Sequence, residues 1–243
     1  MSRVFAVCLS AFVVGGIGLY LASRKAEPAV RRGRLIKFVT YFCIVNIVLL
    51  SAFAGRLVFS VVMAAIVVLG ACELYAVRGS CGRQGVAWGV GAAYVLIAAG
   101  AVLFAWRSRA AVAAVVYLVV CTFDGFSQVT GQLLGRRRLA PTLSPGKTVE
   151  GSFGGLVFAM GMVFLLRPVV GWSVGGSLSA GCLIALAALT GDLMASWVKR
   201  RSGIKDFGAL LPGHGGILDR FDSLLVVAAS CAVAVEVARL VHL

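Results

Sequence analysis

The sequence predicts an all-α fold, a polytopic integral membrane helical bundle with about eight transmembrane helices. Hydrophobic residues make up 60% of the 243-residue chain, charged residues make up only 13%, and the mean hydropathy is +1.00. Soluble domains are about half apolar and about a quarter charged. Apolar stretches of about 20 residues, the length that a helix needs to cross a bilayer, recur along the whole chain. These observations place the protein in lipid.

Eight apolar stretches are long enough to be membrane-spanning helices. The first could also be a secretory signal, but it is longer than a usual signal core and only Arg3 precedes it, so we expect a membrane helix. No water-exposed stretch is long enough to fold separately, which favours a single transmembrane domain over 1–243. The expected spans are 4–22, 38–54, 57–77, 86–105, 110–135, 151–167, 174–198 and 223–242.

Lysine and arginine are divided unequally between the two sets of loops. Alternating the eight spans puts 17 of the 23 Lys and Arg residues on one side. Under the positive-inside rule that side is cytoplasmic, and both termini face outward. The basic loops are 23–37, 78–85, 136–150 and 199–222, and the other side keeps Arg3, Arg56, Arg107, Arg109, Arg167 and Arg239.

The formal net charge of +14 raises the question of a nucleic-acid partner. The basic residues lie in short clusters between apolar spans, where positive charge fixes topology and attracts anionic headgroups. We therefore expect no nucleic acid and a membrane lipid partner instead. The stretch 23–37, with Pro28 and six basic residues, resembles a linker and is expected to anchor the chain on anionic lipid.

Only nine acidic residues occur in the chain, so their positions are informative. Asp124 and Asp192 fall within the inner parts of expected spans, where a charge costs about 3 kcal/mol on insertion scales. Such residues usually pair with another group or have a functional role. Each shares a helical face with polar side chains, namely Gln128 and Gln132 for the first and Ser196 and Lys199 for the second. The alternative for both faces is interhelical hydrogen bonding.

The loop 199–222 alternates cations, glycines and carboxylates. Phosphate chemistry at a membrane needs these residue types. Carboxylates hold Mg²⁺, Lys and Arg neutralise phosphate oxygens, and glycine backbone approaches phosphate closely. The alternative is an irregular charged loop that leads into a helix whose start is stabilised by acids.

A second polar segment, 144–151, contains Gly146-Lys147-Thr148, which resembles the end of a P-loop. That motif is rejected, because Pro141 stands where it requires glycine and a helical membrane chain offers no preceding strand. We expect instead that Lys147 lies in a turn shaped by proline and glycine, beside a helix start, where it contacts phosphate. The alternative is a basic loop that only sets topology.

The segment from Ser196 to Asp222 resembles the defining motif of phosphatidate cytidylyltransferases, also called CDP-diacylglycerol synthases. It runs Ser196-Trp-Val-Lys-Arg-Arg-Ser-Gly-Ile-Lys-Asp-Phe-Gly-Ala-Leu-Leu-Pro-Gly-His-Gly-Gly-Ile-Leu-Asp-Arg-Phe-Asp222. The segment 144–151 is similar to the second segment of that family, and Asp124 occupies the place of its membrane-embedded acid. The similarity covers a motif-bearing region of 120–225, whereas residues 1–110 are expected to form amino-terminal helices without a known specific role.

This resemblance implies a helical membrane enzyme that binds CTP and a divalent metal, Mg²⁺ or Mn²⁺, on the cytoplasmic side. A phosphate oxygen of phosphatidic acid attacks the α-phosphorus of CTP, and pyrophosphate leaves. The family is often dimeric, so a homodimer in the bacterial inner membrane is expected, with a monovalent cation as a further candidate ion.

From the residues and the resemblance together we predict a set of site residues. The predicted metal ligands are Asp192, Asp219 and Asp222, with Asp124 as a further candidate. The predicted catalytic residues are these first three aspartates together with Lys147, Lys205 and Arg220. The predicted substrate-binding residues are Ser144, Lys147, Thr148, Ser196, Lys199, Arg200, His214, Gly215 and Gly216.

Two other kinds of function are consistent with the composition. One is a CTP-dependent lipid kinase or a cytidylyltransferase for another lipid phosphate. The other is a membrane transporter or scaffold, in which intramembrane acids serve as proton or ion sites. Most polar residues fall in cytoplasmic loops rather than along a path through the membrane, which disfavours a transporter.

Overall fold

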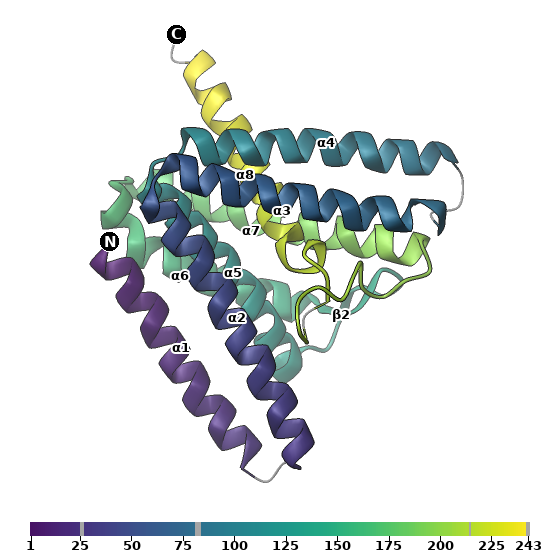
Figure 1. Ribbon diagram of the computed structural model, residues 1–243. Coiled ribbons are helices and arrows are strands. Elements are labelled where there is room, and N and C mark those ends of the chain that lie inside the picture. The colour runs from purple at the N-terminus through teal and green to yellow at the C-terminus, as the bar shows by residue number, and fades with distance from the viewer. Residues whose placement is uncertain (25–26, 81–83, 214, 242–243) are drawn as a thin grey trace.

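The computed structural model describes residues 1–24, 27–80, 84–213 and 215–241, and nearly all of it is α-helical (Figure 1). Within these ranges eight α-helices follow one another, with a short 3-10 helix at Arg78–Ser80 and one two-stranded hairpin. The all-α bundle expected from the sequence is confirmed. The helices are α1 (Ser2–Ser23), α2 (Pro28–Ala54), α3 (Arg56–Val77), α4 (Gln84–Arg107), α5 (Ala110–Leu134), α6 (Val149–Val170), α7 (Val174–Arg201) and α8 (Leu218–Val241).

Seven of these helices, α2 to α8, are long and apolar enough to cross a bilayer, and the chain is an integral membrane protein. The described apolar part of α1, Ser2–Ile17, is shorter. Helix α1 packs against α2, where Phe12 meets Phe42 edge to face with ring centroids 4.9 Å apart. The first apolar stretch is therefore a helix that packs in the bundle, and its crossing of the membrane stays a prediction.

The linker expected at 23–37 is wrong, because α2 already begins at Pro28. Proline suits the first position of a helix, since it has no amide hydrogen to leave unpaired and its φ is preset. The residues that follow include Arg31, Arg32 and Arg34, which are good helix formers and lie exposed. The helix thus begins before its apolar part, and the basic residues lie in its first turns.

The turn expected around Lys147 is also wrong, because this segment is a β-strand. Strand β1 (Arg138–Ala140) pairs antiparallel with β2 (Ser144–Thr148), and the turn between them is at 141–143. Proline is tolerated in such a strand because both strands are edges and the missing amide need not join the ladder. The hairpin runs directly into α6 at Val149.

Helix α5 lies at the centre of the bundle. Its run from Ala113 to Val120 is buried along its whole length, and α5 packs most extensively against α6. The closeness of this pair depends on glycine, because a Cβ at Gly155 would lie 2.8 Å from the backbone oxygen of Phe123. Small residues let membrane helices approach in this way. The contact fixes the start of α6, and with it the hairpin, beside the C-terminal half of α5.

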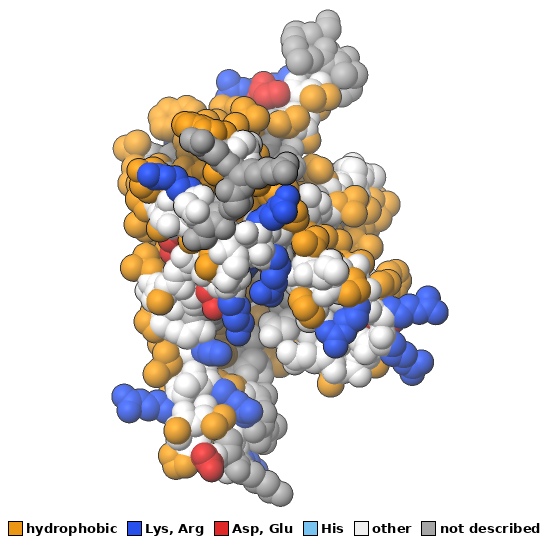
Figure 2. All heavy atoms as spheres, turned by 90° about the vertical axis from the view of Figure 1, so that its right-hand side faces the viewer, with side chains coloured by type: hydrophobic (Ala, Val, Ile, Leu, Met, Phe, Trp, Pro, Cys, Tyr) orange, Lys and Arg blue, Asp and Glu red, His pale blue; other side chains and the backbone are white. Residues whose placement is uncertain are grey.

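Contacts join three of the segments that were predicted to lie on one side, namely the hairpin, the loop between α7 and α8 and the start of α2. The Arg200 Nε atom donates to the carbonyl of Leu143 in the hairpin turn at 3.2 Å. A Cβ at Gly213, in the loop between α7 and α8, would lie 2.8 Å from Lys37 Cγ at the start of α2. Figure 2 shows Lys and Arg side chains spread over the face that it views, with a few acidic side chains among them.

Candidate active site

Three aspartates from three helices converge beside these joined segments. They are Asp124 of α5, Asp192 of α7 and Asp222 of α8. The charge of Asp192 acts on both of the other carboxyl groups, and the charge of Asp124 also acts on Asp222. The hydroxyl of Ser223 lies 3.5 Å from an Asp124 carboxylate oxygen and 3.2 Å from the carbonyl of Ala188. Like charges held this close repel, so the arrangement favours positive charge among them.

A glycine sets the spacing between Asp192 and Asp222. A Cβ added at Gly191 would lie 2.8 Å from the backbone oxygen of Asp222 and 3.0 Å from Ser223 Cα. Helices α7 and α8 therefore touch through backbone at the position next to Asp192. The approach of the two helices, rather than a flexible loop, brings these two carboxylates together.

Lys147 projects from strand β2 into the acidic cluster. Its ammonium group forms an ion pair with an Asp192 carboxylate oxygen, and both side chains are largely buried, at 18% and 32% exposed. The Lys147 charge also acts on Asp124. Ser196, one turn along α7, donates to the other side of the Asp192 carboxylate at 3.4 Å. The hairpin thus supplies a cation to a group of three acids.

The hairpin that carries Lys147 is fastened at both ends. The Thr148 hydroxyl caps α6 by accepting from the Gly151 amide at 3.0 Å. Glu150 accepts from the backbone amides of Arg136 and Arg137 at 3.0 and 3.1 Å. These contacts tie the strand to the helix behind it and position the lysine.

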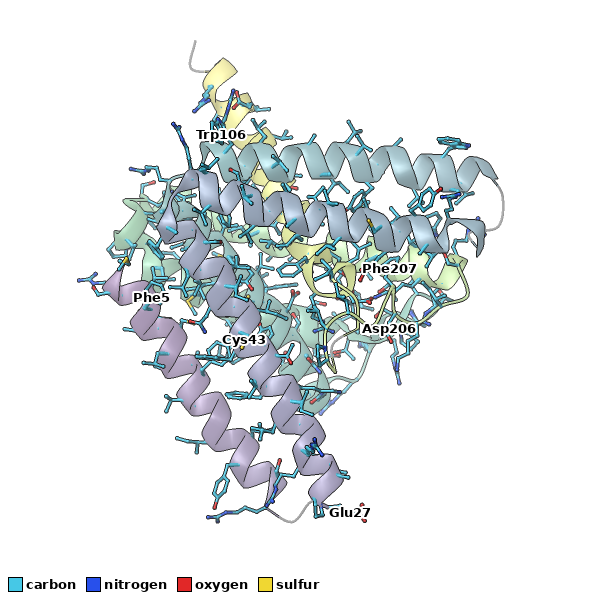
Figure 3. The ribbon with its side chains drawn as sticks, viewed as in Figure 1. Phe5, Glu27, Cys43, Trp106, Asp206 and Phe207 are labelled. Atoms are coloured by element: carbon cyan, nitrogen blue, oxygen red, sulfur yellow. The ribbon has the colours of Figure 1, made fainter. Side chains whose placement is uncertain are left out.

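Asp219 is not part of the cluster of three acids but lies in the first turn of α8, against the loop between α7 and α8. One of its oxygens accepts from the Lys199 ammonium at 2.9 Å. The other accepts from the backbone amides of Phe207 and Gly216, at 2.8 and 2.9 Å. Its side chain is 3% exposed, so both oxygens are occupied and nearly sealed from solvent. Figure 3 shows Phe207 and its neighbour Asp206 in this loop.

Glu73 is an acid that holds the loop before α8 and that the sequence analysis passed over. From the C-terminal end of α3 it accepts from the amides of Ile217 and Leu218 at 2.9 and 2.8 Å, and so caps the start of α8. A Cβ at Gly216 would lie 2.4 Å from its carboxylate, so a larger residue there would displace the Glu73 side chain from these amides. Its position could have marked it in the sequence, because it is one of only nine acidic residues and lies near the end of an expected membrane span.

The remaining predicted residues surround the cluster at different depths. Ser144 and Thr148 are half-buried at the two ends of β2, and Lys205 and Arg220 are exposed, with the Arg220 charge acting on Asp124. Gly215 has a φ of +82°, which favours glycine. His214 lies outside the described residues.

A family model described as the Cytidylyltransferase family matches residues 84–238, more than half of the chain. The chain belongs to this family. The matched range includes all four members of the buried cluster, Asp124, Lys147, Asp192 and Asp222. The resemblance noted from the motifs is therefore confirmed at the level of the family.

Curated relatives in this cytidylyltransferase family come from several bacteria. A phosphatidate cytidylyltransferase of Staphylococcus saprophyticus is 42% identical over 113 residues, covering 46% of this chain and 44% of its own length. One from Haemophilus influenzae is 40% identical over 115 residues, covering 45% and 40%. The uncharacterized protein YnbB of Escherichia coli is 44% identical over 99 residues, covering 40% and 33%. The chain thus spans less than half the length of these relatives.

The donor atoms of the cytidylyltransferase cluster suit a hard divalent cation. In the part of the chain that the structure describes, no group of three or more His, Cys, Asp and Glu side chains lies close enough to hold a metal as it stands. The three converging carboxylates still offer only oxygen donors, which Mg²⁺ prefers, and Mg²⁺ commonly uses one or two carboxylates with substrate phosphates and water. The Lys147 ammonium now supplies positive charge at Asp192. The residues therefore fit a divalent cation that arrives with phosphate ligands.

A large apolar cavity opens next to the cluster. It has a volume of about 670 Å³ and lies between α4, α7 and α8, with walls that include Val90, Ile97, Met194 and Leu225. Asp222 and Thr190 also line it, so the carboxylate cluster and the apolar space are continuous. Such a cavity accommodates hydrocarbon beside a polar reaction centre.

Proposed function

We propose that this chain transfers CMP from CTP to phosphatidic acid, giving CDP-diacylglycerol and pyrophosphate. The observation that carries the proposal is the position of Lys147 among three carboxylates at the edge of an apolar cavity. Relatives that are named phosphatidate cytidylyltransferases support the choice of substrates. A charged phosphate centre that opens onto hydrocarbon-compatible space suits one water-soluble and one lipid reactant.

The proposed reaction needs little acid or base catalysis. A phosphate oxygen of phosphatidic acid forms a bond to the α-phosphorus of CTP, and the bond from that phosphorus to the bridging oxygen of pyrophosphate breaks. The nucleophile arrives already anionic, and the leaving pyrophosphate carries the electron pair away. Positioning and charge neutralisation are then the main contributions of the protein.

The chain offers cations at two depths for this task. Lys147 lies inside the cluster and would exchange its ion pair with Asp192 for a substrate phosphate. Arg200, Lys205 and Arg220 lie at the exposed rim and would attract and hold the triphosphate. Lys199 is partly buried against Asp219 and its charge also acts on Asp222, so it links the loop to the centre.

We propose that Asp192 and Asp222, with Asp124, hold Mg²⁺ or Mn²⁺. When bound, the metal would supply Lewis-acid polarisation and offset the charge of the CTP phosphates. In this proposal Asp219 acts by holding the loop through Lys199, Phe207 and Gly216, because both its oxygens are already used. Its role as a direct metal ligand, and the involvement of a monovalent cation, stay predictions.

We also propose that the cluster faces the cytoplasm of a bacterial inner membrane. The support is that 17 of the 23 Lys and Arg residues belong to the four loops that alternate onto one side in the sequence, and that contacts join three of these segments beside the cluster. Cysteines engineered into the hairpin and into the loop before α8 are expected to resist an impermeant reagent in intact cells. Modification of these cysteines in intact cells would contradict the proposed topology and place both loops outside. The homodimer stays a prediction.

A direct assay tests the proposed activity. Purified protein is incubated with labelled CTP, phosphatidic acid and Mg²⁺, and the expected product is a chloroform-soluble cytidine lipid formed together with pyrophosphate. Phosphorylated lipid without cytidine would instead show a CTP-dependent kinase. If no diacylglycerol phosphate reacts but a polyprenyl or ether-linked lipid phosphate does, the proposed substrate is wrong and the proposed type of reaction is right.

A further inference from the structure

A second cavity lies at the other end of the bundle and is lined by three arginines. It has a volume of about 460 Å³ and is formed by the ends of α2 and α4 and the starts of α3 and α5. Its lining includes Arg56, Arg107 and Arg109 together with Trp106 and Ser108. Figure 3 shows Trp106 well away from Asp206 and Phe207, which mark the end that carries the acidic cluster.

The positive charge of this cavity exceeds its negative charge. Arg107 pairs with Glu236 of α8, but the same carboxylate also accepts from Arg239 at 3.2 Å. Arg56 stacks on the Trp106 ring with its guanidinium carbon 4.9 Å from the centroid, and Arg109 donates to the carbonyl of Val170 at 3.3 Å. Among the described residues neither Arg56 nor Arg109 forms a salt bridge.

The backbone adds to this field. Helix α3 starts at Arg56 and α5 starts just after Arg109, and neither start has a side-chain cap. The first amides of a helix carry partial positive charge and seek an acceptor. Two such starts therefore border a cavity that is already rich in guanidinium groups, which raises its preference for an anion.

The geometry points to a phosphate-binding site here, and we propose that it holds the phosphate of an anionic phospholipid headgroup. Guanidinium groups bind phosphate oxygens through paired hydrogen bonds. Trp106 is half-exposed, as suits a ring at the membrane interface, and the buried walls at Ala52 and Phe59 are apolar. Inorganic phosphate could form the same hydrogen bonds with the arginines, but it has no apolar part to contact the walls of the cavity. The site is independent of the proposed transfer reaction.

Trp106 provides a reporter inside the cavity. A variant in which Trp88, Trp172 and Trp197 are replaced by phenylalanine leaves it as the only tryptophan. In detergent, dihexanoyl-phosphatidylglycerol is expected to change its fluorescence saturably, at concentrations where inorganic phosphate and dihexanoyl-phosphatidylcholine have little effect. An equal response to inorganic phosphate would overturn the lipid source. No saturable response to either anion would overturn the site.

Matched substitutions identify the arginines. The double variant Arg56→Gln with Arg109→Gln is expected to weaken phosphatidylglycerol binding by about tenfold or more, the effect of losing charged hydrogen bonds. The control, Arg3→Gln with Arg167→Gln, makes the same charge change at positions that do not line the cavity, and is expected to bind normally. Equal weakening in both would show a general charge effect and overturn the site.

One substitution is expected to strengthen binding. Glu236→Gln removes the partner of Arg107 and should lower the concentration of phosphatidylglycerol needed for half-saturation. Weaker binding in this variant would contradict the proposal. If the single-tryptophan variant does not fold, the shift in melting temperature caused by phosphatidylglycerol is measured in the otherwise unchanged chain. That shift should be reduced by the Arg56 and Arg109 double substitution and kept by the control.

Discussion

Five acids of this protein fall into two regions that use the same carboxylate group in opposite ways. Around the loop before α8, Glu73 of α3 and Asp219 of α8 each accept from two backbone amides and hold the chain in place. In the centre between α5, α7 and α8, Asp124 and Asp192 accept from side-chain hydroxyls, Asp192 also pairs with Lys147, and Asp222 accepts from the amide of the adjacent Ser223. An acid that binds several backbone amides supports the structure. An acid left facing other acids is available for a ligand.

The largest expected effect comes from the centre. Asp192→Asn keeps the size of the side chain and removes the charge that pairs with Lys147 and faces Asp222. Turnover should fall by at least about a hundredfold, the range seen when one preorganised electrostatic contact is lost. The melting temperature should change little, because losing the ion pair with Lys147 is offset by losing the repulsion between Asp192 and the other two carboxylates. Asp206→Asn, at an exposed loop position, is the matched control.

Metal dependence sharpens this first comparison. If Asp192 holds the cation, the residual activity of Asp192→Asn should require a higher Mg²⁺ concentration than the wild type, whereas Asp206→Asn should not shift it. Near-normal turnover with an unchanged Mg²⁺ requirement would mean that Asp192 only pairs with Lys147, and the distinction between the two regions would fail.

Lys147→Met is the next largest effect. The substitution keeps the length of the side chain and removes the only lysine of the hairpin. A lost hydrogen bond to a charged group costs about 1.5 to 3 kcal/mol, so turnover should fall roughly ten- to hundredfold. The measurement is the steady-state rate with saturating phosphatidic acid. Arg138→Met, exposed on the neighbouring strand, is the control. Activity of the lysine variant within about twofold of that control would show that Lys147 only sets topology.

Glu73→Gln tests the other region through stability rather than rate. The glutamine side chain keeps one acceptor oxygen, but its NH2 group, a donor, replaces the oxygen that faced the backbone N–H of Ile217 or Leu218. An unpaired buried donor costs about 1 to 3 kcal/mol, so the melting temperature should fall. Turnover per folded molecule should fall much less than in Asp192→Asn. Glu27→Gln, exposed at the start of α2, is the control.

The opposite result would be equally informative. If Glu73→Gln removed turnover and left the melting temperature unchanged, Glu73 would belong to the reaction centre, and binding to backbone amides would not distinguish supporting acids from working ones. Gly216→Ala offers a second test, because its Cβ would lie 2.4 Å from the same carboxylate. It should lower stability without removing any charge.

The sequence predicted the helices well because membrane spans have a strong local signal. About 20 apolar residues in a row leave the backbone no choice but to satisfy its hydrogen bonds within a helix. The hairpin and the start of α2 were missed because polar segments carry no such constraint. Pro145 and Gly146 indicate a turn by local preference, yet they lie in a strand because Arg138 and Ala140 pair with it.

The site was predictable in its residue types but not in its division of roles. Asp192 and Lys147 were marked by rarity and by position, and they do meet. Which acid faces the centre depends on where neighbouring backbone amides lie, and this follows only from tertiary packing. Asp219 is three residues from Asp222, so spacing alone suggests equal roles, whereas the loop amides of Phe207 and Gly216 take up Asp219. Glu73 was missed because its partners are far away in the sequence.

The smallest expected effect is that of Ser196→Ala. Its hydroxyl donates to Asp192 over a long 3.4 Å, so the lost contact is weak, and turnover should change by only about twofold to threefold. Ser179→Ala, an exposed serine on the same helix, is the control and should show no change. Separate kcat and KM values decide between two roles. If Ser196 only orients Asp192, kcat should fall slightly and the KM for CTP should stay the same. A rise in the KM for CTP of about tenfold, worth about 1.4 kcal/mol, would instead make Ser196 a direct contact of the nucleotide and extend the centre one turn along α7.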